Sequence, residues 1–497
     1  MTFKLNSILR INKPVIFYPW LLVMLFILTK IQYYGINPGW SQILVFLTLN
    51  LVLLILVFVI LNYIFKDRFK VWLIDFFLFV LLLFFSKIKT PISDAAFFNS
   101  IFNGFPARGG HLLFVIFFFV LFVISILIIR YKGSLKRVSL FLNMLLTLLI
   151  IYQIFADGKQ NTRKIRLVSE SEIVTERNEL KNISLPDIYY IILDAYTSNA
   201  SLKEFWGYDN KDFEDYLRGK GFLITTNSRT NYNMTPYSLA SSLNMSYLTK
   251  IPHYFPSAAQ TQNLFDLVDS SRVVKTLLKN NYEFVNYSFF NIQNKPKFYN
   301  DYFFFLKSNL LDGTIYESFA KKLIKNWTRN QNAGLFTLES TDATILNKLP
   351  EKINSMKSPH FVYAHIMLPH EPYFFDESGT PQEPDSALNY LSKSRYLKQL
   401  KYLNKLVIKT VSRIFENNSE KLPVIIIQGD HGWRYLYGKN RLKESGTILN
   451  AYFFPDQDYG KIYPSISPVN TFRVILNKYL DSNLKLLKDT TYNVYVY

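Results

Sequence analysis

Five long apolar runs divide the first 155 residues, and they constrain the fold more than any other feature of the sequence. A helix needs roughly 17–25 apolar residues to cross a lipid bilayer. The runs predict transmembrane helices at about 15–34, 43–65, 71–87, 111–129 and 138–155. The third run is short and contains Asp75, which we interpret as a structural polar residue near the lipid headgroups, with pairing inside the bundle as the alternative.

Basic residues in the connections between these runs predict the orientation, because Lys and Arg collect on the cytoplasmic side. They occupy the N-terminal tail, the connection after the second run and the connection after the fourth: Lys4, Arg10, Lys13; Lys66, Arg68, Lys70; Arg130, Lys132, Lys136 and Arg137. With five spans, everything after Phe155 then lies outside the cytoplasm. No small-residue cleavage site follows the first run, so we expect an anchor and not a signal peptide.

The distribution of charge and the absence of cysteine exclude several classes of protein. Residues 1–160 carry 15 Lys and Arg against 4 Asp and Glu, and this positive charge lies between apolar runs. A nucleic-acid-binding protein would place its basic residues on a soluble face, so binding of nucleic acid is not expected. Without cysteine the chain has no disulfide scaffold, no thiolate zinc site and no cysteine nucleophile.

The chain after the apolar runs changes character twice. Residues 156–185 are polar and charged and predict a juxtamembrane stalk, and residues 186–497 have the composition of a soluble domain. Short apolar runs in this domain predict buried parallel strands at Ile188–Leu193, Phe361–Ile366 and Val424–Ile427. Helical patterns cover Leu264–Asn280 and Tyr390–Phe415, so the predicted fold class is α/β.

Carboxylates follow two of the predicted strands directly. Asp194 comes after the first strand, and Asp430 with His431 and Gly432 comes after the third. In α/β sheets, ligand-binding and catalytic residues lie at the carboxyl ends of the parallel strands. On its own, Asp194 is better explained as a cap of the next helix, whereas an adjacent Asp and His offer two metal ligands of different type.

A third polar cluster surrounds Thr235, which is followed by Pro236 and an apolar helical pattern. Threonine before proline predicts a helix N-cap with proline at the first helical position. A helix N-terminus presents free N–H groups and a positive dipole end, which favour phosphate and an alkoxide at the capping hydroxyl. The alternative is an ordinary cap.

The order of these elements resembles the alkaline phosphatase/sulfatase superfamily: strand-Asp, Thr at a helix start, Pro-His-x-Pro-Tyr, and strand-Asp-His-Gly. With the five spans, the chain is most similar to the membrane phosphotransferases, lipoteichoic acid synthase and lipid A phosphoethanolamine transferase. The Thr-x-x-Ser-Leu spacing at Thr235 also resembles the nucleophile motif of the latter. The resemblance implies an α/β sandwich catalytic domain of alkaline phosphatase/sulfatase-like type behind a five-helix transmembrane bundle. It also implies Thr235 as nucleophile and one divalent metal ion (Mn, Zn or Mg) bound by Asp194, Thr235, Asp430 and His431.

Further candidate residues flank these motifs. His370 lies in the Pro-His-x-Pro-Tyr element, and the resemblance implies that it binds phosphate or acts as acid/base, a task that suits the pKa of histidine. His365 is either a second such residue or a buried structural histidine. Four more side chains are candidates to bind phosphate oxygens, with solvated loop positions as the alternative: Arg229, Asn231, Asn233 and Arg434.

The sequence also departs from the family pattern. No histidine follows His431, which argues against a complete second metal site. The first acidic ligand is Asp194, where close relatives typically have Glu. True sulfatases use a formylglycine made from Cys or Ser in a Cys/Ser-x-Pro-x-Arg motif, and Thr235-Pro-Tyr-Ser stands in that place. This excludes the sulfatase mechanism and favours attack of a threonine on phosphorus.

Together these observations predict a multi-pass protein of a bacterial-type inner membrane with an extracytoplasmic catalytic domain. We expect it to transfer a phospho-alcohol headgroup, of the glycerol phosphate or phosphoethanolamine class, through a threonine-linked intermediate. The donor would be a membrane phospholipid and the acceptor an extracytoplasmic glycan, lipid or polymer. A phosphodiesterase or phosphatase of the same fold is one alternative. A catalytically inactive subunit for envelope assembly is another, although all four ligand positions hold competent residues.

Overall fold

The computed structural model describes most of the chain. The described residues are 16–34, 40–85, 106–160, 164–168, 185–251, 258–295, 310–311, 314–316, 338–351, 359–371, 373–380, 382, 391–435 and 440–494. The basic N-terminal tail and most of the predicted stalk lie outside them. The chain divides into two compact units, a helical unit of residues 1–162 with 301–331, and an α/β unit of residues 163–300 with 332–497.

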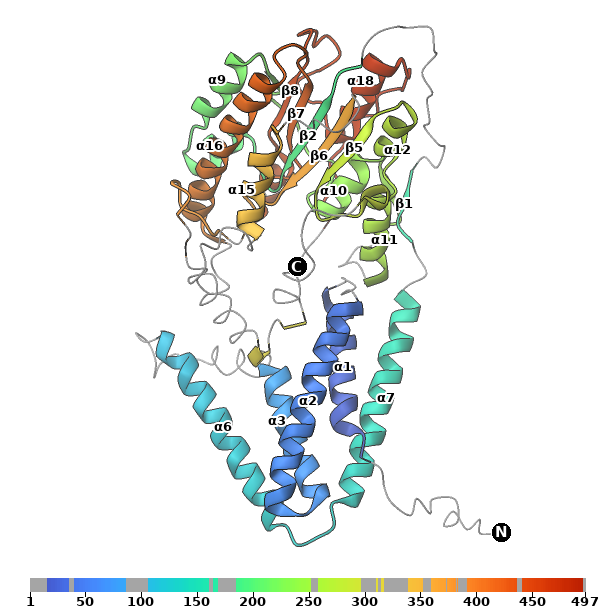
Figure 1. Ribbon diagram of the computed structural model, residues 1–497, viewed down its shortest axis with the longest axis vertical. Helices are drawn as coiled ribbons and strands as arrows, with labels where there is room; N and C mark the ends of the chain where they lie inside the picture. The colour runs from blue at the N-terminus through green and yellow to red at the C-terminus, as the bar shows by residue number, and fades with distance from the viewer. Residues whose placement is uncertain are drawn as a thin grey trace, which may run out of the picture. The chain divides into compact units, whose positions relative to one another are not determined.

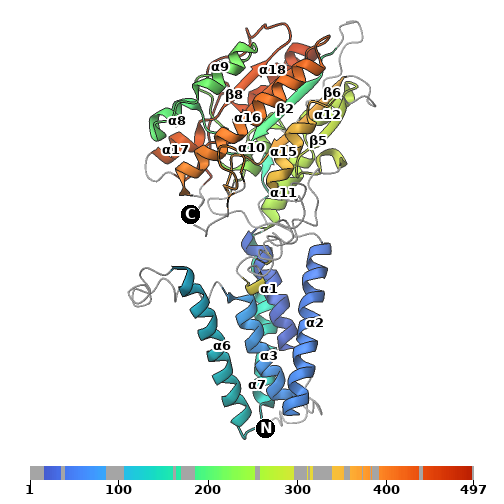
Figure 2. The ribbon, with the colours of Figure 1, turned by 60° about the vertical axis from the view of Figure 1, so that its left-hand side comes forward.

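The helical unit contains a helix at each of the five predicted runs: α1 (Tyr18–Tyr34), α2 (Trp40–Phe65), α3 (Arg68–Leu83), α6 (Pro106–Arg130) and α7 (Lys136–Gln160). Within the described residues, Ile43–Phe65 and Lys136–Phe155 are long and apolar enough to cross a membrane. Tyr18–Ile31 and Ile116–Arg130 are shorter apolar helices. Figure 2 shows α1, α2, α3 and α7 alongside one another, with α6 diverging from them. A helix is therefore present at each of the five predicted runs, and two of these helices meet the requirements of a span over the residues that are described.

Aromatic and aliphatic side chains fill the interior of the helical unit. Phe26 of α1 stacks on Phe46 of α2 with ring centroids 5.7 Å apart. Leu310, Leu311 and Ile315 are buried in the same apolar cluster, although they follow the α/β unit's β5 in sequence. These three side chains thus pack with the helical unit and not with the sheet. Asp75 of α3 is fully buried in this interior.

A mixed six-stranded sheet forms the centre of the α/β unit, in the order β3-β8-β7-β2-β6-β5. Its four parallel strands are β2 (Ile188–Leu193), β5 (Glu283–Tyr287), β6 (His360–Ile366) and β7 (Val424–Gly429). β8 (Asn450–Phe453) and β3 (Leu223–Ile224) complete one edge in antiparallel pairing. The three predicted strands are confirmed, and they are direct neighbours because β2 pairs with both β6 and β7. Ile188 is in register with Phe361 and Val424, so the three strands end together.

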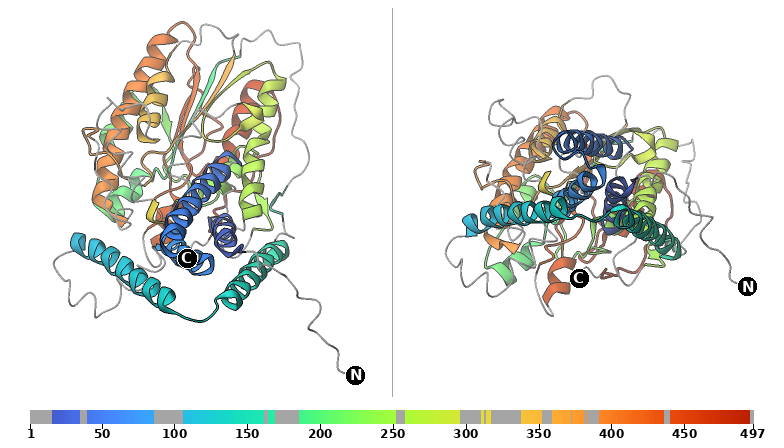
Figure 3. Two further views of the ribbon diagram at one scale, coloured as in Figure 1. Left: turned by 60° about the horizontal axis from the view of Figure 1, so that its bottom comes forward. Right: turned by 90° about the horizontal axis from the view of Figure 1, so that it is seen from below.

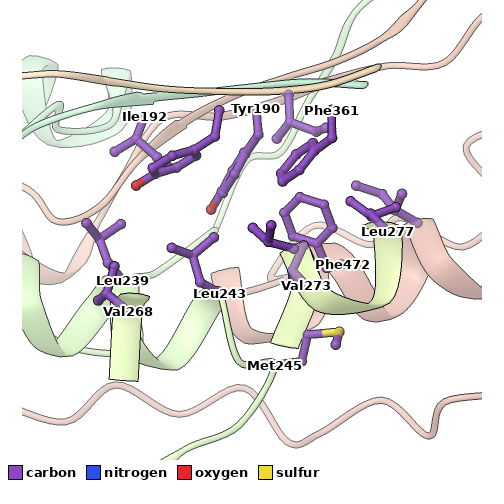
Figure 4. Packing of buried hydrophobic residues seen from close by; sticks show 14 of the residues in the cluster. Tyr190, Ile192, Leu239, Leu243, Met245, Val268, Val273, Leu277, Phe361 and Phe472 are labelled. Atoms are coloured by element: carbon purple, nitrogen blue, oxygen red, sulfur yellow. The ribbon is translucent and has the colours of Figure 1, made fainter. Parts of the chain in front are cut away.

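Helices cover both faces of the sheet, as Figure 1 and the left view of Figure 3 show. One face carries α10 (Thr235–Ser242), α11 (Ala258–Asp269), α12 (Arg272–Lys279) and α18 (Pro468–Leu480). The other carries α9 (Lys211–Gly219), α15 (Leu338–Lys348) and α16 (Lys393–Asn417). Burial on both faces explains why every residue of β2 is buried and why its sequence is almost continuously apolar. In Figure 4, Tyr190 and Ile192 of β2 face Leu239 and Leu243.

The remaining described elements lie around this core: β1 (Arg166–Leu167) paired with β4 (Leu248–Thr249), α8 (Asn199–Trp206), the 3-10 turn Ile292–Asn294, and α17 (Asn440–Gly446). The predicted helix Leu264–Asn280 is in fact two helices, α11 and α12. Ser271 causes the break, because its backbone leaves the helix and its hydroxyl accepts a hydrogen bond from the N–H of Val274. The predicted helix Tyr390–Phe415 corresponds to α16.

Candidate active site

The carboxyl ends of three neighbouring strands bring the candidate residues together. Asp194 directly follows β2, Asp430 directly follows β7, and His365 is the second-last residue of β6. All three side chains are buried. The sequence predicted these carboxylates just past the carboxyl ends of parallel strands, and the structure places both there, on neighbouring strands.

The carboxylate of Asp430 is held by one oxygen only. Its Oδ1 accepts hydrogen bonds from the backbone N–H of Ala195 (3.0 Å) and of His431 (2.8 Å). Ala195 has a left-handed backbone with a φ of 59°, an uncommon conformation for a residue with a side chain. Asp430 Oδ2 and Asp194 Oδ1 are buried and have no hydrogen-bond partner among the described residues. Two carboxylate oxygens in one cluster are thus available to a cation.

The ring of His431 is oriented by its own loop. Its Nδ1 lies 2.8 Å from the carbonyl oxygen of Gly432. Since a carbonyl only accepts, Nδ1 carries the hydrogen and the lone pair belongs to Nε2. Burial lowers the pKa of His431 and keeps the ring neutral, which is the form that binds metals. Its Nε2 faces Thr235 Oγ1 at 3.2 Å and Asp194 Oδ1 at 3.5 Å.

Thr235 is the first residue of α10, and Met234 holds the N-cap position without a side-chain hydrogen bond. The prediction that Thr235 caps the helix is therefore wrong by one residue. The reason is that its hydroxyl is turned toward the cluster, where it donates to Asp194 Oδ2 at 3.4 Å. The side chain of Ser238, one turn later, is buried and donates to the backbone carbonyl of Asp430 at 2.7 Å.

Two further histidines border Asp194. His365 Nε2 lies 3.3 Å from Asp194 Oδ2, and the ring of His365 packs against Phe289 with centroids 5.1 Å apart. His370 lies in the loop after β6, where its Nδ1 is 2.6 Å from the backbone oxygen of Glu371. The contacts of His365 support the structural alternative for this residue, with its imidazole holding the Asp194 carboxylate.

The proximity of carboxylates and histidines in the cluster shifts the pKa values of Asp194 and His370. Burial by itself would raise the pKa of Asp194, but the nearby His370, His365 and His431 outweigh it and bring the pKa below its usual range. Burial would lower the pKa of His370, yet the Glu371 and Asp194 carboxylates outweigh that effect and raise it. Asp194 is therefore ionised at neutral pH.

The donor set of the cluster fits a divalent metal ion. Two overlapping groups each bring their ligand atoms within 4.8 Å of one another: Asp194, His370 and His431, and Asp194, His365 and Asp430. The hydroxyl of Thr235 has one hydrogen but faces two acceptors, Asp194 Oδ2 and His431 Nε2. Only one of these acceptors can receive the hydrogen, so the other faces the threonine oxygen with lone pairs on both atoms. A cation bound between the two atoms would remove this repulsion. Buried carboxylates and a neutral imidazole are ligands that Zn²⁺, Mn²⁺ or Mg²⁺ accept.

Glycine is required at the end of β7 and in the loop after it because other backbone segments approach closely. A Cβ atom on Gly432 would lie 2.2 Å from the backbone oxygen of Glu444, and one on Gly429 would lie 2.5 Å from that of Tyr196. Both distances are shorter than any real contact of a Cβ atom. The glycine of the Asp-His-Gly motif therefore lets α17 pack against the loop that carries the site.

The four candidate phosphate-binding residues separate into two kinds. Arg434 lies at the cluster, with its NH2 nitrogen 2.7 Å from His370 Nε2. Arg229 contacts Thr491 through Nε at 3.4 Å and lies against Gly446. The side chain of Asn231 is buried and bonds the N–H of Val469, among others, while that of Asn233 bonds the N–H of Val494. The two asparagines thus fasten the loop before α10 to the C-terminal part of the chain.

Three residues beside the cluster were not predicted from the sequence. Glu371 and Tyr435 follow His370 and Arg434 directly, and each contacts the other across the two loops. Gln399 of α16 donates to the backbone oxygen of His370 at 2.9 Å and so fixes the β6 loop. An acidic residue next to the histidine of a Pro-His-x-Pro-Tyr element was the only local signal for Glu371.

Comparison with known families gives a match over this part of the chain. The sequence profile of the family described as Sulfatase matches residues 192–452, just over half of the chain. The matched range includes Asp194, Thr235, His370 and Asp430 with His431. No curated protein sequence matches the chain.

Several solved structures resemble the chain at low identity. The integral membrane lipooligosaccharide phosphoethanolamine transferase A of Neisseria meningitidis has 14% identity and a TM-score of 0.42, with 93% of this chain and 95% of that chain covered. The C-terminal periplasmic domain of EcEptC from Escherichia coli, in complex with Zn, has 11% identity and a TM-score of 0.40, with 64% and 91% covered. That of phosphoethanolamine transferase EptC from Campylobacter jejuni has 13% identity and a TM-score of 0.37, with 60% and 89% covered. At these scores the family assignment depends on the sequence profile alone.

Proposed function

The chain belongs to the sulfatase family of the alkaline phosphatase/sulfatase superfamily, and from this premise we propose that it is a membrane phosphotransferase. The proposed reaction moves a phospho-alcohol headgroup, of the glycerol phosphate or phosphoethanolamine class, from a lipid donor to an extracytoplasmic glycan, lipid or polymer. The helical unit supports a membrane location, because Ile43–Phe65 and Lys136–Phe155 are long and apolar enough to cross a bilayer.

The observation that carries the proposal is the position of the Thr235 hydroxyl. It stands at the N-terminus of α10, partly accessible, and faces both Asp194 Oδ2 and His431 Nε2. A hydroxyl so placed, at the positive end of the helix dipole, suits attack on a phosphorus atom. The chain has no cysteine from which a formylglycine could be made, so the sulfatase mechanism is not proposed.

The proposed reaction has two steps. In the first, Thr235 Oγ1 forms a bond to phosphorus while the bond from phosphorus to the glyceride oxygen breaks, and diacylglycerol leaves with a proton. In the second, the acceptor oxygen forms a bond to the same phosphorus while the bond from phosphorus to Thr235 Oγ1 breaks, and the proton of the acceptor hydroxyl passes to the threonine oxygen. His370 is the group that holds and moves the proton, since its imidazole borders Asp194 and Arg434.

Asp194, Asp430 and His431, completed by Thr235, are the residues that would hold the divalent ion. The ion, when bound, would supply positive charge that lowers the pKa of the threonine hydroxyl and stabilises negative charge on the phosphoryl oxygens. Asp430 is preorganised for this task because its Oδ1 is occupied by two N–H groups while its Oδ2 is available.

Full-length protein in vesicles that contain phosphatidylethanolamine or phosphatidylglycerol tests the proposal. The expected products are diacylglycerol and a phospho-alcohol bound to an added glycan or lipid acceptor. Release of free phospho-alcohol at the same rate with or without acceptor would instead identify a phosphodiesterase. Lipid mass spectrometry of cells with and without the gene would then identify the headgroup that is missing. No turnover of either lipid with the metal ion present would contradict the proposal.

A further inference from the structure

Glu371 connects the two loops that border the candidate site. It lies in the loop after β6, and its Oε1 accepts a hydrogen bond from the Tyr435 hydroxyl in the loop after β7. The same oxygen lies 3.8 Å from NH2 of Arg434, and Oε2 lies 3.5 Å from Nδ1 of His370. Its side chain is 18% exposed. One carboxylate thus touches a guanidinium, an imidazole and a phenol.

The partner of Glu371, Arg434, contacts the residue that precedes the proposed nucleophile. Its NH1 is 3.1 Å from the sulfur of Met234, the residue before Thr235, and its NH2 is 2.7 Å from Nε2 of His370. A thioether and an imidazole nitrogen are weak or neutral acceptors. The guanidinium therefore reaches from Met234 to His370, and Glu371 is the carboxylate that lies nearest to it in an ion pair.

We propose that Glu371 is a positioning residue that holds Arg434 so that the guanidinium receives the non-bridging oxygens of the phosphoryl group attacked by Thr235. This inference depends on the proposed function. An arginine side chain is long and loses rotational freedom when it binds an anion, so a carboxylate that fixes it beforehand removes part of that cost. The planar guanidinium matches two phosphate oxygens at once, which a lysine does not.

The geometry separates this role from that of an ordinary surface ion pair. Glu371 uses different oxygens for Arg434 and His370, so it sets the spacing between these two groups at the candidate site. Tyr435 fixes the first of these oxygens. The carboxylate of Glu377, further along the same loop, provides the contrast, because it is exposed and pairs with Lys401 at 3.1 Å.

The kinetic test uses full-length protein in vesicles that contain the phospholipid on which the wild-type protein is active. The variants are E371Q, R434Q, E371Q/R434Q and Y435F, with E377Q as the control. E371Q should lower kcat/KM about 10- to 100-fold, an effect of the size expected for a misplaced binding group, with unchanged metal content and melting temperature. The double variant should be no worse than R434Q, since Glu371 acts through Arg434. Y435F should show a smaller loss in the same direction, and E377Q should match the wild type. Wild-type kinetics of E371Q, or multiplying effects of E371Q and R434Q, would overturn the proposal.

A second measurement does not require turnover and so separates failure of this inference from failure of the proposed function. Binding of inorganic phosphate to the metal-loaded full-length protein is measured by calorimetry for the wild type, E371Q, R434Q and E377Q. We expect E371Q and R434Q each to weaken binding about tenfold, roughly the value of one charge-assisted hydrogen bond. If E371Q melts early, Y435F takes its place. Equal binding by wild type and R434Q, or by wild type and E371Q, would overturn the role of Glu371 even if transfer activity is established.

Discussion

Asp430 Oδ1 accepts a hydrogen bond from the backbone N–H of Ala195, and this 3.0 Å contact fastens the loop after β7 to the loop after β2. Ala195 has a left-handed backbone, with a φ of 59°, at this contact. The contact occupies one oxygen of Asp430 and leaves the other facing Asp194 and His431. A structural role and the proposed ligand role are thus divided between the two oxygens of one side chain.

This division makes Asp430→Asn a selective test of the metal site. The amide oxygen can still accept the two backbone hydrogen bonds, while an uncharged NH₂ group replaces the available oxygen. We expect the fold to persist and metal content to fall at least tenfold, because a neutral amide is a poor substitute for a carboxylate. Elemental analysis of the purified full-length protein is the measurement, with the exposed Asp456→Asn as control. Equal metal in wild type and in an Asp194/Asp430 double variant would place the ion elsewhere.

The nucleophile is tested by Thr235→Ala. Loss of the hydroxyl should lower turnover 10³-fold or more, which corresponds to about 4 kcal/mol of transition-state stabilisation. Thr235→Ser should retain part of the activity, because the hydroxyl remains. Rapid quench with donor lipid and peptide mapping should place the phospho-alcohol on the peptide with Thr235. Ser238 is the internal comparison, since its buried hydroxyl bonds the Asp430 carbonyl. An adduct on Ser238 would show that the assignment is wrong.

Glu444 should make stability depend on pH. Burial raises its pKa to about 7, and the hydrogen bond from Trp206 and the charge of Lys393 only partly oppose this. The folded protein therefore binds this proton more tightly than the unfolded chain, whose carboxyl titrates near 4.5. The resulting stabilisation is complete below about pH 4.5 and is lost as the pH rises through 7.

Glu444→Gln removes this dependence and keeps an oxygen for Trp206. The variant should match wild type near pH 4.5 and exceed it by up to about 3 kcal/mol at pH 8, since each pKa unit is worth about 1.4 kcal/mol. Denaturant unfolding monitored across this pH range measures the difference. A constant offset at all pH values would mean that the carboxyl does not titrate in this range.

Gly432→Ala should destabilise the α/β unit. The added Cβ would meet the backbone oxygens of Glu444 at 2.2 Å and Thr447 at 2.6 Å, neither of which belongs to a flexible side chain. Overpacking of this kind costs roughly 1–3 kcal/mol. Gly219, in the last turn of α9, is the matched control, because a Cβ there meets no described atom within 4 Å. Thermal unfolding should show a lower melting temperature for Gly432→Ala than for the wild type. The melting temperature of Gly219→Ala should not be lowered.

Reporter fusions at the C-terminus test the orientation. The basic connections predict that the α/β unit lies outside the cytoplasm, as a lipid-linked donor and an envelope acceptor would require. An exported phosphatase reporter should be active and a fluorescent protein that matures only in the cytoplasm should be dark. Strong fluorescence from the second fusion would contradict both the five-span topology and the side on which the substrate is expected.

The strands and their terminal carboxylates were predictable because burial on both faces of a parallel sheet leaves a continuous apolar run that ends abruptly. For that reason alone, the sequence sufficed to place Asp194 and Asp430 at the carboxyl ends of strands. The contacts among Glu371, Arg434 and Tyr435 could not be predicted, since they depend on how two loops fold toward each other. The N-cap of α10 was misplaced by one residue because the hydroxyl of Thr235 had two possible uses, and local sequence does not rank a cap against a buried cluster.

Leu310, Leu311 and Ile315 affect how the α/β unit can be produced as a separate fragment. They lie in the apolar interior of the helical unit, and the hydroxyl of nearby Tyr316 reaches Oδ1 of Asn50 at 3.1 Å. A fragment that starts after residue 162 would retain this segment but lose its surroundings, and exposed apolar residues promote aggregation. Soluble production of the α/β unit therefore calls for excision of the segment or substitution of these three side chains as well as deletion of the N-terminal helices.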